Sequence, residues 1–293
     1  MFIDIHLHTR RAKGFPREWD NATYASPDEL IEIFDQVGIE KAVVLPAASP
    51  ECCHVPQSME TLLETLEEYD RFIPFCNCDP RFLKNSPDAP LADFLRFYKE
   101  KGCKGVGEVT ANMYFDDPMV ENLFAACQET KLPLTFHIGP QVGGCYGLVD
   151  DPGLPRLEKA LQKFPELVFL GHSQPFWAEI GKLEKPEDRN GYPKGTVTEG
   201  RVPELMRKYP NLHGDLSAGS GHNAVSRDEE FGMRFLEEFQ ERLYFGTDMT
   251  SPGGAASQAP LASYLLRLRE EAKISQECFE NIARGNARRL LEL

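Results

Sequence analysis

The fold prediction starts from residues 2–8, which read FIDIHLH. Its phenylalanine, isoleucines and leucine favour a β-strand. Residues i and i+2 of a strand share a face, so Asp4, His6 and His8 are expected to point to the same side. Two adjacent imidazoles at a strand end form a pair of metal ligands. Taken alone, the pair fits a surface histidine beside a buried one equally well, so the rest of the chain has to decide.

Seven further apolar segments follow, roughly every 30 to 45 residues, which is the spacing of a βα unit. Several are almost continuous in Val, Ile, Leu and Phe, as is typical of parallel strands buried on both faces. The predicted strands are Phe2–His8, Lys41–Ala47, Phe72–Cys78, Lys104–Thr110, Pro133–Ile138, Leu167–His172, Leu212–Ser217 and Leu243–Asp248.

The segments between these strands have helical signals. Ser26 and Glu29 form the pattern of a capping box, and Gly38 is a helix stop. Ser226 and Glu229 repeat the capping box before an apolar stretch. Amphipathic spacing predicts helices at Met59–Tyr69, Leu91–Lys101, Met119–Thr130 and Pro155–Phe164.

Eight strands alternating with helices predict a (β/α)8 TIM barrel, with residues 1–293 as a single domain. The alternative is a doubly wound open sheet. Four irregular stretches follow strands and are therefore expected at the C-terminal rim of the barrel, where active sites of this fold are built. They are Thr9–Ala25, Pro140–Pro152, Gln174–Arg201 and Gly219–Ser226.

Composition and net charge limit the classes of partner that this protein is expected to bind. The net charge of −14 argues against nucleic acid and anionic membranes, because neutralising phosphates takes a basic surface. The sequence has no apolar run of about 18 residues, so no membrane span is expected. Eight cysteines without a secretory leader pattern predict reduced thiols in the cytoplasm. A small molecule is the expected partner, and a homo-oligomer stays open.

Six potential metal ligands fall at or near the C-terminal ends of predicted strands. Each alone has an ordinary explanation: a buried histidine, half of a salt bridge, or a helix cap. Strand ends of a barrel meet at one rim, so together they predict a metal site. The six are His6, His8, Glu108, His137, His172 and Asp248.

These positions resemble the amidohydrolase superfamily, in particular its amidohydrolase-related branch, over the whole chain. The shared signatures are Asp4-x-His6-x-His8, the single histidines His137 and His172, and the segment FGTD at residues 245–248. Residues 281–291 resemble that branch's closing helix. The resemblance implies a metal held by His6, His8 and Asp248, usually with His137. It implies that His172 binds a second metal or contacts the substrate.

Glu108 departs from part of this family. Many mononuclear members, including the decarboxylases, have no bridging ligand on strand 4, whereas other members carry a bridging carboxylate or a carbamylated lysine. TatD-like nucleases share the arrangement His-x-His, Glu, His, His, Asp, which makes a TatD-like phosphodiesterase an alternative. The strand 8 and C-terminal sequences resemble that group less, and the acidic charge disfavours DNA. Glu108 is therefore a candidate bridge between two metals.

Imidazole and carboxylate ligands suit zinc best, with manganese, iron or cobalt as alternatives and one or two ions per chain. Such an ion lowers the pKa of a bound water toward ~7 and polarises a carbonyl or phosphoryl oxygen. Asp248 is predicted to be both a ligand and the general base that returns the proton to the leaving group. His172 is predicted to orient or polarise the substrate.

Rim residues supply candidate substrate contacts. Arg10 and Arg11 could bind a substrate carboxylate, although surface arginines are the simpler interpretation. His222 lies in the stretch after the seventh strand. Trp177 and Tyr192 lie in the loop after the sixth strand, where ordinary aromatic packing would explain these two residues equally well. The predicted substrate-binding residues are Arg10, Arg11, His222 and Trp177.

The cysteine pairs are interpreted as structural. Cys52-Cys53-His54 and the pair Cys76 and Cys78 lack the Cys-x-x-Cys spacing of structural zinc sites. Alternation places Cys76 and Cys78 on one face, where small buried thiols fit a barrel wall.

The leading functional prediction is a metal-dependent hydrolase of a small ester, lactone or amide. The second is a metal-dependent decarboxylase of an aromatic or unsaturated carboxylic acid, which needs a metal and a cationic carboxylate clamp. A barrel that only binds a ligand is a third interpretation, disfavoured because groups for both a metal and a water are present. Two metals per chain would favour hydrolysis, whereas one would leave both reactions open.

Overall fold

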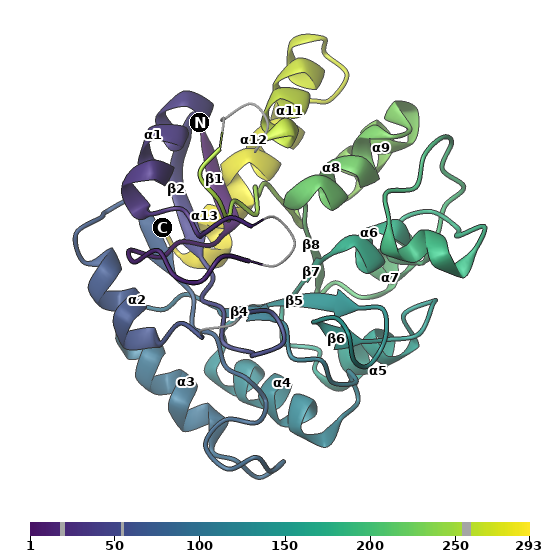
Figure 1. Cartoon of the computed structure of the whole chain (residues 1–293). Helices are drawn as coiled ribbons and strands as arrows, with labels where there is room; N and C mark the ends of the chain where they lie inside the picture. Colours follow the sequence, from purple (N-terminus) through teal and green to yellow (C-terminus); the bar gives the residue numbers. More distant parts are fainter. Residues whose placement is uncertain (18–20, 54–55, 254–258) are drawn as a thin grey trace.

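The computed structural model describes residues 1–17, 21–53, 56–253 and 259–293. Parallel strands form the centre of the molecule and helices surround them (Figure 1). The eight strands of this wall are β1 (Phe2–Leu7), β2 (Ile39–Val44), β3 (Phe72–Pro74), β4 (Val106–Val109), β5 (Leu134–Gly139), β7 (Phe169–His172), β8 (Leu212–Asp215) and β9 (Leu243–Tyr244). Each overlaps one predicted strand.

Backbone hydrogen bonds join the sheet β1-β2-β3 to the sheet β4-β5-β7-β8-β9 on both sides. On one side, the Cys76 N–H donates to the Gly105 carbonyl at 2.8 Å, and a parallel bridge pairs Cys76 with Val106. On the other, the Ile5 N–H donates to the Phe245 carbonyl at 2.9 Å, and the Asp248 N–H to the His6 carbonyl at 2.7 Å. The predicted (β/α)8 barrel is confirmed.

The helices also follow the sequence signals closely. They are α1 (Pro27–Val37), α2 (Met59–Leu66), α3 (Leu91–Glu100), α4 (Pro118–Thr130), α5 (Pro155–Lys163), α6 (Gln174–Ala178), the 3-10 helix η1 (Pro186–Asn190), α7 (Arg201–Lys208), α8 (Ala218–Ser226), α9 (Glu229–Glu238), α11 (Pro260–Glu270), α12 (Gln276–Glu280), the π-helix η2 (Asn281–Gly285) and α13 (Asn286–Leu291). Ser26 and Glu29 form the predicted capping box of α1, and Gly38 ends that helix with φ 83°.

Several local predictions were wrong. Ser226 does not cap α9, because it belongs to the last turn of α8; the carboxylate of Asp228 accepts from the Phe231 N–H instead. The stretch 219–226 is therefore helical rather than a rim loop. The stretch 140–152 contains an unpredicted short strand, β6 (Leu148–Val149), which pairs with the end of β5.

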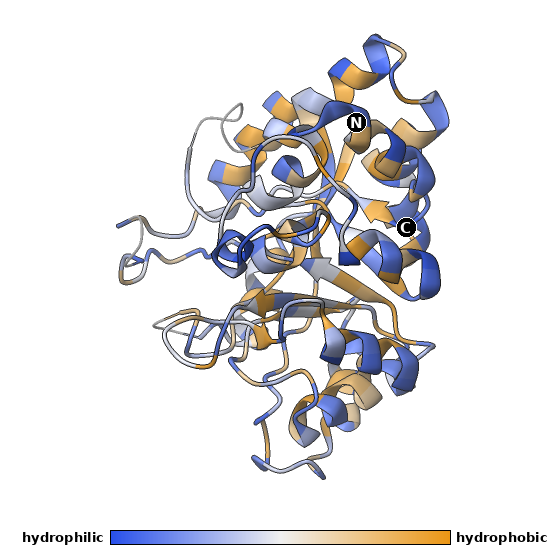
Figure 2. Ribbon diagram, turned by 90° about the vertical axis from the view of Figure 1, so that its right-hand side faces the viewer, coloured by the Kyte–Doolittle hydropathy of each residue, from blue (hydrophilic) through white to orange (hydrophobic). Residues whose placement is uncertain are grey.

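Apolar side chains close the barrel below its rim. Figure 2 shows the long connecting loops on the left and the C-terminus on the right, with apolar strands in between. Ile3, Ile5 and Leu170 pack together with Ala287 and Leu291 of α13, so the last helix covers the end of the barrel opposite the loops.

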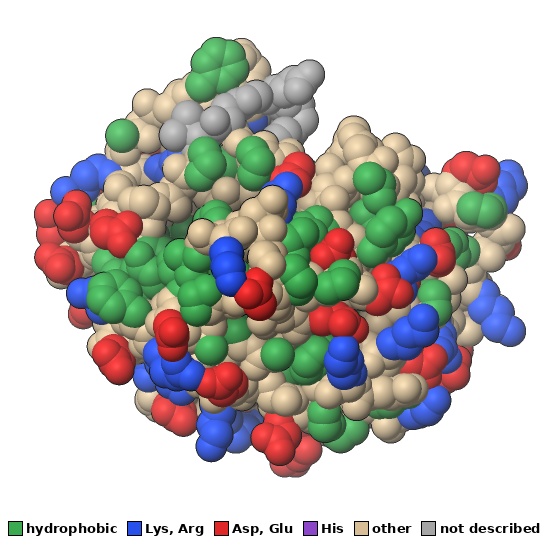
Figure 3. All heavy atoms as spheres, turned by 90° about the horizontal axis from the view of Figure 1, so that it is seen from below, with side chains coloured by type: hydrophobic (Ala, Val, Ile, Leu, Met, Phe, Trp, Pro, Cys, Tyr) green, Lys and Arg blue, Asp and Glu red, His purple; other side chains and the backbone are tan. Residues whose placement is uncertain are grey.

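The outer surface is mixed in charge where Figure 3 shows it, with basic, acidic and apolar side chains interspersed around α3 and α4. No helix in the described ranges is both long enough and apolar enough to span a membrane.

Candidate metal centre

The structure brings all six predicted ligands together at the rim. His6 comes from β1, Glu108 from β4, His137 from β5 and His172 from β7, while His8 directly follows β1 and Asp248 follows β9. Five of them are buried, and the Asp248 side chain is 25% exposed. Within the described residues, side chains of this cluster form two groups whose ligand atoms lie within 4.8 Å of one another, and His6 and His172 form a third such group with Asp215.

The first group gathers around Asp248. The Nε2 atoms of His6 and His8 are 3.2 Å apart. They lie 3.5 and 3.4 Å from Asp248 Oδ1. They also lie 3.7 and 3.6 Å from Glu108 Oε2. Two imidazole nitrogens and two carboxylate oxygens thus face a common point.

The second group gathers around the other oxygen of Glu108. Oε1 is 2.7 Å from His137 Nδ1 and 3.6 Å from His172 Nε2. Gly107 makes this placement of Glu108 feasible, because it has φ 148° and a Cβ there would lie 2.9 Å from Thr135. One carboxylate therefore faces two separate pairs of histidines, one with each oxygen.

Neighbouring acceptors orient the histidine rings. His8 Nδ1 donates to the Leu45 carbonyl at 2.7 Å, which leaves the Nε2 lone pair toward the cluster. His6 Nδ1 donates to Asp215 Oδ2 at 2.6 Å. His172 Nδ1 lies 2.9 Å from Ser217 Oγ. Metal-binding histidines commonly have such partners, which fix the tautomer and raise ligand basicity. The donor set fits a divalent ion such as zinc.

Asp215 is a site residue that the sequence analysis missed. It ends β8, the seventh strand of the barrel, and is fully buried. Its carboxylate contacts His6 and lies 3.5 Å from His172 Nδ1. Its position after a strand was the available signal, but a single aspartate there also fits a helix cap.

Asp4 does not join the cluster, contrary to the alternation argument. Its carboxylate accepts from the Thr247 N–H at 3.0 Å, the Thr247 hydroxyl at 2.5 Å and the His6 N–H at 3.0 Å. The pairing of β1 with β2 shifts register between Asp4 and Leu7, so strict alternation fails there. Asp4 instead holds the segment before Asp248, whose φ of 57° is uncommon for a residue with a side chain.

Electrostatics favour a cation in the cluster. Burial opposes ionisation of Glu108 and Asp248, yet the adjacent histidines hold the pKa of both carboxyls below their usual range. Burial, together with the nearby His6, lowers the pKa of His172 to about 4, so its imidazole is neutral and free to bind a metal. The cluster thus combines ionised carboxylates with at least one neutral imidazole.

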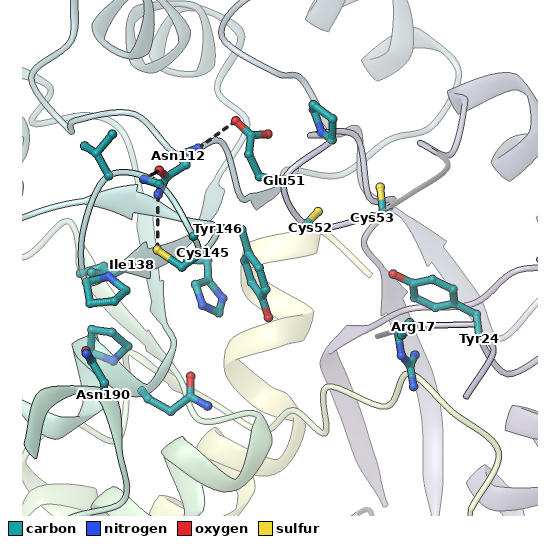
Figure 4. A pocket seen from close by; sticks show the side chains of 18 of the residues that line it. Arg17, Tyr24, Glu51, Cys52, Cys53, Asn112, Ile138, Cys145, Tyr146 and Asn190 are labelled. Carbon is teal, nitrogen blue, oxygen red and sulfur yellow. Dashed lines mark hydrogen bonds between the residues drawn. The ribbon is translucent and has the colours of Figure 1, made fainter. Parts of the chain in front are cut away.

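A cavity of about 830 Å³ opens beside the cluster and is lined by His137, Arg10, Arg17 and Tyr24, among others. Figure 4 shows Tyr146 and Cys145 on one side of it and Tyr24 and Arg17 on the other. The Tyr146 ring lies 4.5 Å from the His137 ring. Sequence analysis missed Tyr24 and Tyr146, because aromatic residues in rim loops have no distinctive spacing.

Of the four predicted substrate-binding residues, the structure places only Arg10 in the lining of the described cavity. Arg10 lines the cavity, and its Nε and Nη2 atoms are buried without a hydrogen-bond partner among the described residues. Arg11 is half exposed and pairs with Glu68 at 2.6 Å. The cavity lining includes neither Trp177 nor His222. His222 lies in α8, and its ring packs on Tyr264 of α11.

Trp177 requires a correction, because it belongs to the core. It is 1% exposed, and its indole N–H donates to the Asp215 carbonyl at 2.8 Å. The loop that was expected to present it at the rim begins with α6, which turns the side chain inward. Of the predicted cysteines, Cys76 and Cys78 are buried as expected, and His54 lies outside the described residues.

Replacing Asp215 by asparagine is expected to weaken metal binding about 10–100-fold, since His6 loses its carboxylate partner. Chelator-competition titration with zinc measures this affinity. Asp150→Asn is the matched control, because Asp150 is equally buried but accepts from the Leu157 N–H, outside the cluster. Equal zinc affinity in wild type and Asp215→Asn would contradict the assigned role.

Solved structures resemble the chain throughout its length. A zinc-bound amidohydrolase from Burkholderia multivorans is 13% identical with a TM-score of 0.65, covering 100% of this chain and 99% of that one. A probable 2-pyrone-4,6-dicarboxylic acid hydrolase from Acinetobacter baumannii is 13% identical with a TM-score of 0.58 and the same coverage. The 5-carboxyvanillate decarboxylase from Sphingomonas paucimobilis is 14% identical with a TM-score of 0.60, again over 100% and 99%.

At these identities the likeness shows the fold, and the bound zinc, hydrolase and decarboxylase belong to those proteins. No curated protein matches the chain in sequence. The sequence pattern of the amidohydrolase family matches residues 3–293, almost the entire length. The chain therefore belongs to the amidohydrolase family.

Proposed function

We propose that this protein is a metal-dependent hydrolase that holds two divalent ions, with zinc the best-suited metal, and acts on a small ester, lactone or amide. The observation that carries the proposal is the position of Glu108. Its Oε2 faces His6 and His8, and its Oε1 faces His137 and His172. A carboxylate between two ligand sets fits a bridge, and hydrolytic sites commonly use paired ions.

The proposed ligand sets are His6, His8 and Asp248 on one side of Glu108, and His137 and His172 on the other. Divalent ions bound there would acidify a water molecule and polarise the bond to be cleaved. The chain's own residues supply the proton transfer.

Asp248 is the proposed general base. Its side chain is 25% exposed, compared with 8% for Glu108 and none for Asp215, so it is the carboxylate within reach of a substrate. Ionised Asp248 takes a proton from water and passes it to the leaving group. His172, whose Nε2 lies 3.7 Å from Asp248 Oδ2, orients the substrate or binds a metal beside it.

Tyr146 is a further proposed contributor. Burial, with Glu108 and Asp248 nearby, raises the pKa of Tyr146, so its phenol keeps its proton. Figure 4 shows the ring projecting into the cavity. A phenol held there can donate a hydrogen bond to a substrate oxygen on which charge develops.

Decarboxylation is the second candidate, favoured by one observation. Arg10 brings a guanidinium with unpaired N–H groups into the cavity. Such a group suits a substrate carboxylate. A carboxylate held by Arg10 fits a decarboxylase, but equally a hydrolase whose substrate carries a spectator carboxylate.

Metal content tests the main proposal. We expect the wild type to bind two zinc equivalents per chain and Glu108→Gln to bind no more than one, because the amide is a poorer bridge than the carboxylate. Elemental analysis after dialysis against zinc measures both values. Glu51→Gln is a matched control, because Glu51 lines the same cavity but pairs with Arg81. One equivalent in wild type and in Glu108→Gln alike would reject the two-metal hydrolase.

The role of Arg10 in substrate binding can be tested with the adjacent Arg11 as a matched control. In a screen of lactones, esters and aromatic carboxylates, Arg10→Met is expected to reduce kcat/KM for carboxylate-bearing substrates about 10–100-fold, because a charge-assisted hydrogen bond is lost. Arg11→Met should leave it unchanged, because Arg11 pairs with Glu68 outside the cavity. Product analysis separates hydrolysis from release of carbon dioxide. Equal kcat/KM in wild type and Arg10→Met would remove Arg10 from the substrate site.

A further inference from the structure

Three of the eight thiols differ from the others in their surroundings. Cys76, Cys78, Cys103, Cys127 and Cys278 are buried. Cys52, Cys53 and Cys145 are only half-buried, and all three line the cavity beside the metal centre. The described thiols that a small reagent can reach are therefore concentrated at the active-site cavity.

Cys52 and Cys53 face the same way, although they are neighbours in sequence. Adjacent side chains of an extended chain point to opposite sides. Here a turn starts at Ser49, whose carbonyl accepts from the Cys52 N–H at 3.2 Å. The same oxygen lies 3.2 Å from Cys52 Sγ and 3.5 Å from Cys53 Sγ. Both sulfurs therefore lie on one side of the backbone.

Side chains from other elements fix this turn. Ser49 Oγ donates to Asp79 Oδ2 at 2.8 Å, and Glu51 pairs with Arg81 at 2.9 Å. The two thiols thus belong to a wall that is anchored before any reagent binds, which lowers the entropic cost of engaging both at once.

The two sulfurs also have polar neighbours on the cavity side. The Thr110 hydroxyl donates to Cys52 Sγ at 3.1 Å. The neighbouring Cys52 side chain and, to a smaller extent, the Arg10 guanidinium lower the pKa of the Cys53 thiol. Figure 4 shows both sulfurs in the cavity wall, apart from Cys145 near Asn112.

We propose that Cys52 and Cys53 form a dithiol site that captures organic trivalent arsenic compounds in the active-site cavity. Each thiol forms one sulfur–arsenic bond, the arsenic–oxygen double bond of R–As=O breaks, and its oxygen leaves as water with the two thiol protons. Arsenic stays trivalent, so no oxidant or reductant takes part.

Two sulfurs and one carbon complete the coordination of trivalent arsenic. Zinc prefers four ligands, and no group of described residues that could hold a metal includes either thiol. This coordination favours arsenic over a structural zinc ion. The adduct would occupy the cavity next to Arg10 and exclude substrate.

Phenylarsine oxide tests the proposal on the reduced, metal-loaded protein. Intact-mass spectrometry is expected to show one phenylarsenic group per chain, and peptide mapping should place it on residues 52 and 53. A dithiol reagent should remove it, whereas a monothiol at the same concentration should not. A wild-type adduct elsewhere, or none, would overturn the proposal without any variant.

Cysteine-to-serine variants provide a second test of the arsenic site. Cys52→Ser and Cys53→Ser should each lose at least 10-fold in stable arsenic incorporation, because one sulfur–arsenic bond is missing. Cys145→Ser, which removes the other half-buried thiol of the same cavity, should retain the wild-type level. Incorporation that falls only in Cys145→Ser would contradict the assignment. Thermal melting of each variant confirms that folded protein is compared.

Discussion

The site depends on one buried carboxylate, Glu108, that faces two pairs of histidines. An ionised carboxylate without partners would be costly at this depth. The histidine rings offset that cost and hold its pKa low. The backbone makes the position available, because Gly107 permits β4 to approach Thr135 closely. The chemistry of the cluster therefore follows from where β4 ends relative to β1, β5 and β7.

A second layer of residues holds the side chains of the metal-ligand cluster in place. Asp215 and the Leu45 carbonyl fix the rings of His6 and His8, so their Nε2 atoms face the cluster. Asp4 and Thr247 hold the segment that carries Asp248. Buried polar networks of this kind specify one geometry because each member is satisfied by another. Trp177 extends the layer into the core through its hydrogen bond to the Asp215 carbonyl.

The sequence predicted the barrel and the cluster because both depend on a repeated pattern. Buried parallel strands are nearly continuous apolar runs, and the ligands lie at their ends, so the pattern could place His137 and His172 at the rim together with the other ligands. The roles of Asp215 and Asp4 could not be predicted from this pattern. Asp215 acts through His6 rather than on the cavity, and Asp4 lies where the register of β1 shifts. Neither feature changes the spacing of residues along the chain.

Rim residues were the least predictable part of the site, because helices and loops outside the strands decide their direction. Arg10 and Arg11 are adjacent, yet one lines the cavity and the other pairs with Glu68. Trp177 and His222 belong to helices α6 and α8 that pack on the barrel instead of extending from it. The paired orientation of Cys52 and Cys53 likewise comes from a turn that composition does not reveal.

Anomalous X-ray diffraction from zinc-loaded crystals would test the central claim most directly. Two zinc peaks are predicted, one beside His6, His8 and Asp248 and the other beside His137 and His172, with one Glu108 oxygen on each. A single peak without Glu108 among its ligands, and with that carboxylate still paired to His137, would contradict the bridging role.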